Sequence, residues 1–101
     1  MLGRKELRTT DDAVYITPPG SGVLVHAIYF ANTTGSRRTI RLHHVSQGQS
    51  SGTNNALFYD VAIAPNGTLI DSTRMTLKPG DQLRGKADAL GVSVTIYGIG
   101  S

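Results

Sequence analysis

The longest nearly uninterrupted apolar stretch of the chain, residues 23–32, reads VLVHAIYFAN. In an extended strand the side chains alternate between two faces. One face then carries Leu24, His26, Ile28 and Phe30, and the other carries Val23, Val25, Ala27, Tyr29 and Ala31. Both faces are largely apolar, which is typical of a strand that is covered on both sides. The stretch is far shorter than the roughly 20 residues of a membrane-spanning helix, so it does not predict one. It therefore predicts a long strand in the middle of a sheet or against a neighbour.

The rest of the sequence continues this extended pattern on both sides of residues 23–32. Alternation typical of strands occurs in seven further segments: 13–17, 38–45, 57–63, 68–71, 74–77, 82–86 and 92–99. Turn signals separate them at intervals of roughly 8 to 12 residues, and no segment has a convincing 3.6-residue period. The sequence thus predicts an all-β fold, an antiparallel, jelly-roll-like β-sandwich of about eight strands.

Two short motifs are predicted to be structural turns. Asn66 and Gly67 lie between alternating segments, and both residue types tolerate positive φ, so the pair predicts a hairpin. Pro79 and Gly80 are followed by Asp81, and they occupy the two central positions of a four-residue turn. Proline followed by glycine at these positions is the order that a type II turn requires.

The length and the polar segments predict the domain organisation. A chain of 101 residues holds one core. Residues 1–12 are polar and have neither the two-residue period of a strand nor the 3.6-residue period of a helix, so they predict an extended N-terminal arm. Residues 13–101 predict a single β-sandwich domain. Residues 46–55 contain no apolar side chain and predict an exposed loop. The chain has no cysteine, which excludes disulfides, thiolate nucleophiles and cysteine-based metal sites.

The composition indicates how such a small domain is stabilised. Only 6% of the residues are aromatic, so the core is built from Val, Ile, Leu and Ala. For small domains, the gain from burying apolar surface roughly balances the entropy cost of ordering the chain. Association with copies of the same chain, as dimers or trimers, or with a larger body is therefore expected to add stability.

Neither a metal site nor a catalytic site is expected, and no cofactor is expected. His43 and His44 are adjacent in a predicted strand, so their side chains point to opposite faces and cannot share one ion without a bulge. His26 could share a face with His44, but no carboxylate has ligand spacing to them. The sequence contains no nucleophile elbow and no glycine-rich phosphate loop. We therefore expect that the protein is not an enzyme.

The net positive charge of the chain is compatible with nucleic-acid binding, but the placement of the aromatic residues favours a protein partner. The formal charge is +3 and the isoelectric point is about 9.6. Basic residues form two groups in the sequence: Arg4, Lys5 and Arg8, and Arg37, Arg38 and Arg41. Proteins that bind single-stranded nucleic acid stack bases on exposed aromatic rings, whereas all the aromatic residues here lie inside predicted strands. We therefore assign the two basic groups to contacts with a protein partner, where arginine is enriched.

Four segments together resemble small jelly-roll-like structural proteins of tailed-bacteriophage virions. They are the end of the long strand with its turn, residues 29–36; the turn 65–68; the turn 77–83; and the closing strand 92–98. The resemblance covers about Val14 to Ile99. It implies a capsid decoration (cement) protein that binds the major capsid protein, or another virion protein, as a trimer or dimer. It supplies no catalytic residues.

Three alternatives remain open at this point. They are a structural or adhesion module of a phage tail or fibre, a small basic nucleic-acid-binding β-barrel, and a receptor- or carbohydrate-binding tip. A glycan site would normally present exposed Trp or Tyr, and the absence of Trp weakens that last alternative. The start of the sequence has basic residues without an apolar run behind them, so it does not predict a signal peptide. We accordingly expect no membrane partner, assembly in the host cytoplasm and a final location on the virion, with the capsid surface preferred to the tail.

Overall fold

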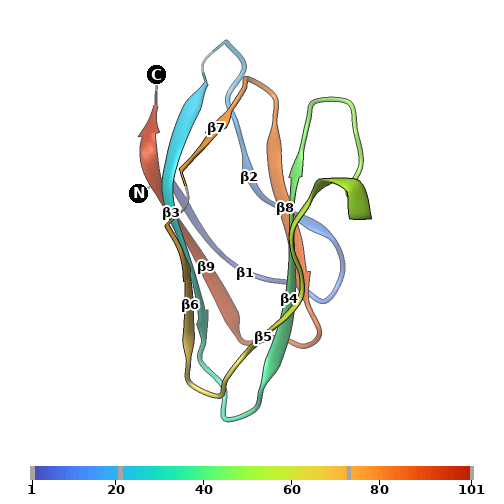
Figure 1. Cartoon of the computed structure of the whole chain (residues 1–101), viewed down its shortest axis with the longest axis vertical. Helices are drawn as coiled ribbons and strands as arrows, with labels where there is room; N and C mark the ends of the chain where they lie inside the picture. Colours follow the sequence, from blue (N-terminus) through green and yellow to red (C-terminus); the bar gives the residue numbers. More distant parts are fainter. Residues whose placement is uncertain (1, 21, 73, 101) are drawn as a thin grey trace.

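The chain folds into two antiparallel sheets that pack face to face (Figure 1). The computed structural model describes residues 2–20, 22–72 and 74–100. Sheet A has the order β1 (Gly3–Glu6), β9 (Val92–Gly100), β3 (Val23–Asn32) and β6 (Thr68–Asp71), and β7 (Met75–Leu77) also pairs with β3. Sheet B has the order β2 (Asp12–Ile16), β8 (Gln82–Ala87), β4 (Arg38–Val45) and β5 (Ala56–Ile63). The prediction of an antiparallel β-sandwich is confirmed.

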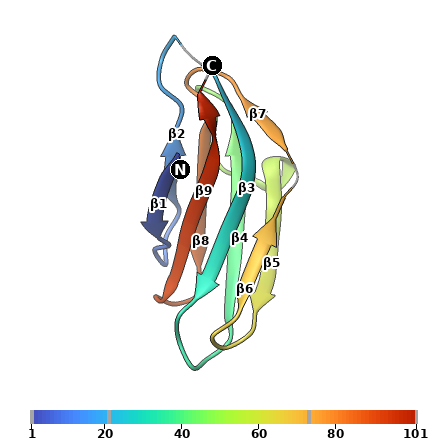
Figure 2. The same ribbon diagram turned by 90° about the vertical axis from the view of Figure 1, so that its left-hand side faces the viewer.

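The strand order is that of a jelly roll. The pairs are nested along the chain: β1 pairs with β9, β2 with β8, β3 with β6 and β7, and β4 with β5. The chain is therefore one long hairpin whose tip is the loop 46–55, and the hairpin is rolled so that its successive pairs alternate between the two sheets (Figure 2). Jelly rolls built from two sheets have this arrangement. The predicted central strand 23–32 lies between β9 and β6/β7, as expected.

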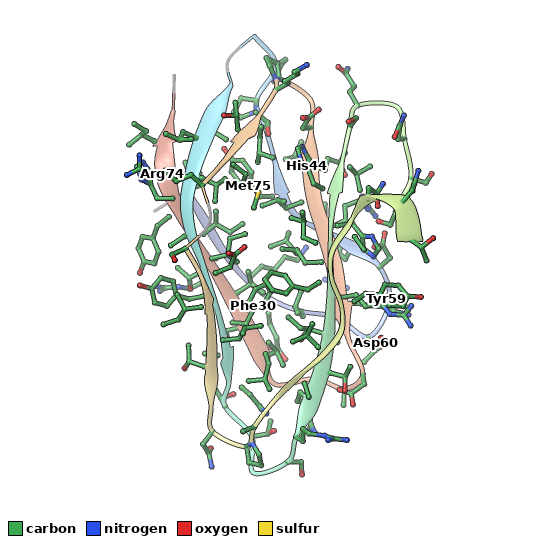
Figure 3. All side chains as sticks on the ribbon, in the orientation of Figure 1. Phe30, His44, Tyr59, Asp60, Arg74 and Met75 are labelled. Atoms are coloured by element: carbon green, nitrogen blue, oxygen red, sulfur yellow. The ribbon has the colours of Figure 1, made fainter. Side chains whose placement is uncertain are left out.

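The core lies between the two sheets and is built almost entirely from aliphatic side chains. Phe30 of β3 is fully buried between the sheets (Figure 3). Its ring packs edge to face against that of Phe58, with the ring centroids 5.5 Å apart. The largest fully buried side chains come from both sheets: Leu7, Ile28, Phe30, Ile40, Leu42, Leu77, Leu83 and Ile96. Such close packing makes each inward position sensitive to a change in volume.

The predicted faces of residues 23–32 are wrong because β3 contains a β-bulge. The register with β9 shifts at His26, so Val23 and Val25 point inward before the bulge, while Ile28 and Phe30 do so after it. The outer face of β3 therefore carries side chains that we expected to be buried. Pairing also passes over Val14 in β2 and over Leu57 and Asp60 in β5, and strict alternation of β5 is lost at Asp60. An extra residue in one strand shifts all later side chains by one face.

The predicted N-terminal arm is part of the sandwich. Residues 3–6 form β1, which is hydrogen-bonded to β9 from Gly3↔Ile96 to Glu6↔Ser93. Leu7 is 2% exposed and belongs to the core, so the separate arm expected for residues 1–12 is corrected over the described part of that range. The segment lacks strand periodicity because its apolar side chains that pack against the core, Leu2 and Leu7, flank β1 and do not alternate within it.

One of the two predicted turns is confirmed, and the other has a different form. The Asp81 amide donates to the Lys78 carbonyl at 3.0 Å, and Gly80 has a φ of 84°, as the type II turn requires. The hairpin at Asn66 and Gly67 is not found, because β5 and β6 belong to different sheets. Here Asn66 has a φ of 56°, and the Gly67 amide donates to the Ala64 carbonyl, so the turn carries the chain from sheet B to sheet A.

The position of Leu7 in the core leads to the first prediction. Leu7→Ala should lower the free energy of unfolding by about 2–5 kcal/mol, because it leaves a cavity between the sheets. Urea denaturation followed by circular dichroism measures this change. Leu90→Ala is the matched control, since Leu90 is 59% exposed and its truncation should change stability by no more than about 0.5 kcal/mol. Equal effects of the two substitutions would contradict the placement of Leu7.

The backbone of the turn 78–81 leads to the second prediction. Gly80→Ala should lower the free energy of unfolding by about 1 kcal/mol or more, because a residue with a Cβ is strained at positive φ. The Gln47 side chain, which lies nearest to the new methyl group, is flexible and can move. Gly35→Ala is the control, since its Cβ would meet open space and its φ is not in the left-handed region. A melting temperature that falls equally in both variants would rule out this explanation.

Candidate functional site

Polar side chains of three adjacent strands gather on the outer face of sheet B. β4 contributes Arg41 and His43, β8 contributes Lys86, and β5 contributes Tyr59 and Asp60. Tyr59 and Asp60 point away from the interior, on the opposite side of sheet B from Phe30 (Figure 3). The β4–β8 ladder is regular along this stretch, so its outward side chains stand side by side.

Arg41 is held in one place by two neighbours from β5. Its Nε and Nη2 donate to the two carboxylate oxygens of Asp60 at 2.6 and 3.1 Å, and its guanidinium lies 4.1 Å from the centre of the Tyr59 ring. Such two-point contact with a carboxylate, together with stacking on an aromatic ring, is specific to arginine. The hydrogen bonds from Arg41 lower the pKa of the Asp60 carboxyl, and the charges of Arg41 and Lys86 add to this effect.

The Asp60 carboxylate reaches Arg41 because of the bulge in β5. Asp60 has a φ of 55°, and the residues on either side of it, Tyr59 and Val61, pair with neighbouring residues of β4. Aspartate is among the few residue types that tolerate the left-handed region. Bulges and left-handed non-glycine residues recur next to functional sites, where they re-aim a side chain.

Two hollows flank Arg41 and Lys86, and we call them together the sheet B groove. One hollow has a volume of about 290 Å³ and is lined by Thr9, Thr39, Arg41, Asp60, Lys86, Ala87 and Asp88. The other has a volume of about 220 Å³ and is lined by Asp11, Arg41, His43, Ser51, Gly52, Thr53, Tyr59 and Lys86. Arg41 and Lys86 belong to both linings, so the hollows meet at these two cations.

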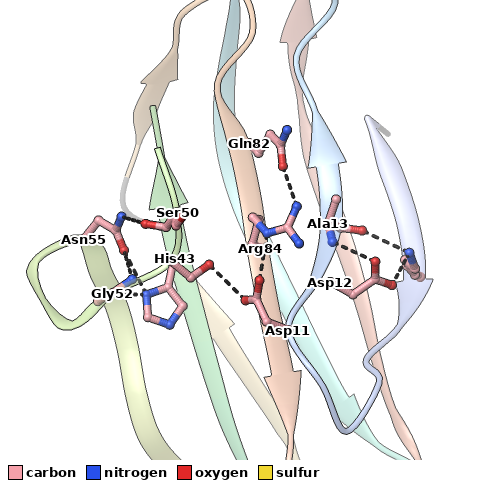
Figure 4. A network of polar contacts seen from close by, with 11 residues as sticks. Asp11, Asp12, Ala13, His43, Ser50, Gly52, Asn55, Gln82 and Arg84 are labelled. Atoms are coloured by element: carbon pink, nitrogen blue, oxygen red, sulfur yellow. Dashed lines mark hydrogen bonds and ion pairs between the residues drawn. The ribbon is translucent and has the colours of Figure 1, made fainter. Parts of the chain in front are cut away.

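The wall formed by the loop 46–55 is tied to the sheet by hydrogen bonds (Figure 4). Nδ1 of His43, which is 6% exposed, lies 2.9 Å from the Gly52 carbonyl and 3.0 Å from Oδ1 of Asn55. Both partners are acceptors, so Nδ1 carries the proton. The Ser51 hydroxyl donates to Asp11, which also accepts from Nε of Arg84 at 2.8 Å. The loop is exposed, as predicted, but its position against the sheet is fixed.

A second polar cluster fixes the turn 78–81 rather than forming a groove. Nε2 of His44 lies 3.0 Å from Oδ2 of Asp81, and the Lys78 amide donates to the same oxygen at 3.1 Å. Burial of Asp81 would raise the pKa of its carboxyl, but the hydrogen bonds from His44 and the backbone outweigh it, and the pKa is lowered. The Asp81 carbonyl also accepts from the Thr17 amide. Asp81 therefore holds the turn 78–81 in place through contacts with His44, the Lys78 amide and the Thr17 amide.

The structure does not bring the six basic residues predicted as a partner surface together. Lys5 and Arg8 both pair with Asp12, at 2.6 and 3.2 Å, at the open edge between β1 and β2. Arg4 contacts the Thr95 hydroxyl. The remaining three lie elsewhere: Arg38 donates to the carbonyls of Leu90 and Arg37, Arg37 is exposed in the turn before β4, and Arg41 binds Asp60. Their proposed role in partner binding stays a prediction.

The outer face of sheet A carries exposed apolar side chains on β3, β6 and β9, with Arg4 and Thr95 beside them. Tyr29 and Tyr97 lie edge to face at 5.4 Å, and Ile70 and Ile99 lie on the same outer face, where their exposed fractions are 53% and 59%. The aromatic residues lie in strands, as predicted, but three tyrosines are substantially exposed: Tyr29 and Tyr97 here and Tyr59 on sheet B. Tyr29 is exposed because the bulge at His26 turns its side chain to the outer face.

Comparison with family models, curated proteins and solved structures gives no match to this chain. Among residues 2–20, 22–72 and 74–100, no three histidine or acidic side chains are grouped so that they could share a metal ion. The same residues contain no helix of the length and hydropathy needed to cross a bilayer. The two outer faces of the sandwich are the surfaces with distinct chemistry among these residues.

The lowered pKa of Asp81 predicts a pH-dependent stability. The folded-state pKa lies below the unfolded value of about 3.9, so the carboxylate stabilises the fold above that pH, and this stabilisation is lost as the pH falls through the folded-state value. Urea unfolding of the wild type and Asp81→Asn between roughly pH 7 and pH 3 tests this. The wild type should be more stable at neutral pH, and the difference should shrink below about pH 4. A difference that is constant with pH would contradict the prediction.

Proposed function

We propose that this protein is a structural component of a virus particle, a capsid decoration protein that assembles through the outer face of sheet A. The observation that carries the proposal is the apolar surface formed there by Tyr29, Ile70, Tyr97 and Ile99. Soluble monomers rarely expose large contiguous apolar patches, and such patches mark interaction sites. Tyrosine in particular is enriched in the centres of protein interfaces.

The dimensions of this face fit a protein–protein interface. Figure 1 looks along the shortest axis and shows both sheets edge-on, so the 41 and 18 Å extents of the whole molecule set the upper limit of a sheet face. That limit is an area on the order of 700 Å², close to the roughly 800 Å² per partner of a standard stable interface. The exposed residues of this face come from β3, β6 and β9 (Figure 2). The same face of a second copy can cover it.

The virion part of the proposal is supported by the strand order. Double-sheet jelly rolls recur in viral capsid domains, although they also occur in proteins of other classes, so this support is by analogy of fold. The resemblance of residues 29–36 and 77–83 to small virion proteins of tailed bacteriophages points in the same direction. A structural or adhesion module of a tail or fibre would use the same apolar face and differs in its location on the particle.

The nucleic-acid alternative has less support from the side-chain contacts. Binding to phosphates requires cations that are available to release counterions. Lys5, Arg8, Arg41 and Arg84 each pair with a carboxylate of this chain. Two of the three exposed tyrosines, Tyr29 and Tyr97, lie on the opposite outer face from Arg41 and Lys86. Tyr59 does lie beside these cations, but one ring is not the series of stacking rings interleaved with basic residues that single-strand binding uses.

The apolar face predicts that a single charge introduced there weakens assembly. Ile70→Lys should reduce self-association at least about tenfold, because a lysine ammonium would be buried between apolar faces. Sedimentation equilibrium measures the oligomeric state of the purified protein. Leu57→Lys is the matched control, since Leu57 is a 42%-exposed aliphatic residue on the edge strand of sheet B. It should leave self-association unchanged.

Two results would contradict the proposal. If the wild-type protein stays monomeric at roughly 100 µM, the proposed self-association through sheet A is wrong. Locating the chain in virus particles by cryo-electron microscopy tests the capsid role separately. A position in the tail or fibre would contradict decoration of the capsid, and absence from the particles would contradict the virion proposal itself.

A further inference from the structure

We propose that the sheet B groove binds a neutral oligosaccharide. The binding residues are the outward side chains of Thr39, Arg41, Tyr59, Asp60 and Lys86. The proposal rests on the opposite face from the one assigned to assembly and does not depend on it. Its basis is the shape, the hydrogen-bonding capacity, the charge balance and the fixed geometry of the groove.

The groove has the size of a small-ligand site. Its two hollows, of about 290 and 220 Å³, meet at Arg41 and Lys86. Together they fall within the range of roughly 300–1,000 Å³ typical of ligand sites. The groove is elongated and open, because it runs from Asp88 at one end to Ser51 at the other along neighbouring strands. This shape suits a chain of sugar rings better than a single compact ligand.

The groove offers hydrogen-bond donors and acceptors close together. Asp60 uses one contact per carboxylate oxygen for Arg41, so lone pairs remain for a ligand. The Arg41 contacts to Asp60 use Nε and Nη2, which leaves Nη1 available. Lys86 forms no ion pair within the described ranges of the chain. A sugar hydroxyl both donates and accepts, so adjacent hydroxyls can bridge a carboxylate and a cation in the same place.

The charge balance favours a neutral ligand over an anion. The cations around the groove are Arg41, Lys86 and Arg84, and the carboxylates are Asp11, Asp60 and Asp88. Arg41 is already paired with Asp60, and Arg84 with Asp11. A phosphate or sulfate would have to compete with these carboxylates for the guanidinium groups. A polyhydroxylated ligand can add to the existing pairs without breaking them.

Tyr59 supplies the apolar contact that a sugar ring requires. Its side chain is 46% exposed, one ring face is covered by the Arg41 guanidinium, and His43 meets it edge to face at 6.5 Å between centroids. The uncovered part of the ring can receive the C–H groups of a pyranose, which are polarised toward an aromatic face. The contacts with Arg41 and His43 hold the ring in place, so little freedom is lost on binding.

The site is built on fixed elements. Asp60 occupies a left-handed bulge, which sets the direction of its carboxylate, and the wall 46–55 is tied to β4 through His43. Sites whose side chains are locked by neighbours bind with a smaller ordering cost. Removal of Tyr59 or of the Asp60 charge should therefore weaken binding without moving the sheet.

Titration of the ¹⁵N-labelled protein, followed by the amide resonances, tests this proposal. The probes are neutral oligosaccharides of glucose, galactose, mannose and N-acetylglucosamine, with inorganic sulfate and a sialylated trisaccharide as anionic probes. At least one neutral probe should shift the amides of Arg41, Tyr59 and Lys86 with a Kd of about 1 mM or below. Tyr59→Ala and Asp60→Asn should each weaken this binding about tenfold or more. Asparagine tolerates the left-handed conformation, so the second variant keeps the bulge.

Leu90→Ala is the control, because Leu90 is 59% exposed and belongs neither to the groove nor to the outer face of sheet A. It should bind the same oligosaccharide as well as the wild type does, and the amide spectra show directly whether each variant is folded. The proposal is overturned if no neutral probe shifts these amides at about 50 mM, or if only the anionic probes do. It is also overturned if Leu90→Ala weakens binding as much as Tyr59→Ala.

Discussion

The pairing of β3 with β9 is the contact on which the rest of the molecule depends. It runs from Val23↔Gly100 to Asn32↔Val92, and it joins residues that are about 60 to 77 positions apart in the sequence. Because the other pairs are nested around the same rolled hairpin, this ladder fixes where β1, β6 and β7 can attach. Contacts between residues so distant in sequence must overcome a large loop-closure entropy before they gain burial. The protein is therefore expected to fold slowly for its size.

The bulges at His26 and Asp60 determine which side chains face the core and which face solvent. At His26 the extra residue keeps Ile28 and Phe30 inward and places Tyr29 outside. At Asp60 it keeps Val61 and Ile63 packed toward the core side while Tyr59 and Asp60 face solvent. One sheet thereby presents tyrosine and isoleucine, and the other presents paired charges and hydroxyls. A jelly roll with two chemically different faces can contact two different partners at the same time.

The strands were predictable from the sequence to within one residue at their ends, because alternation is a local property of consecutive side chains. β1 was missed, because only Leu2 and Leu7, one on each side of the strand, pack against the core, and they form no alternating pattern. The bulges were also missed, since periodicity assumes that no residue is inserted, and only the positive φ of Asp60 has a weak signal in its residue type. The groove could not be predicted, because Arg41, Tyr59 and Lys86 come together only through pairing of distant strands.

The loop 46–55 gives the groove a means of variation. It is the tip of the rolled hairpin, so a longer loop lengthens the segment that every nested pair encloses, and β4–β5 is affected most. Each doubling of the length of such a segment costs only about 0.6 kcal/mol in closure entropy. Ser51, Gly52 and Thr53 form one wall of the groove, while other walls belong to the sheet. If the groove binds an oligosaccharide as proposed, exchange of this segment would change which sugars fit while the two sheets stayed the same.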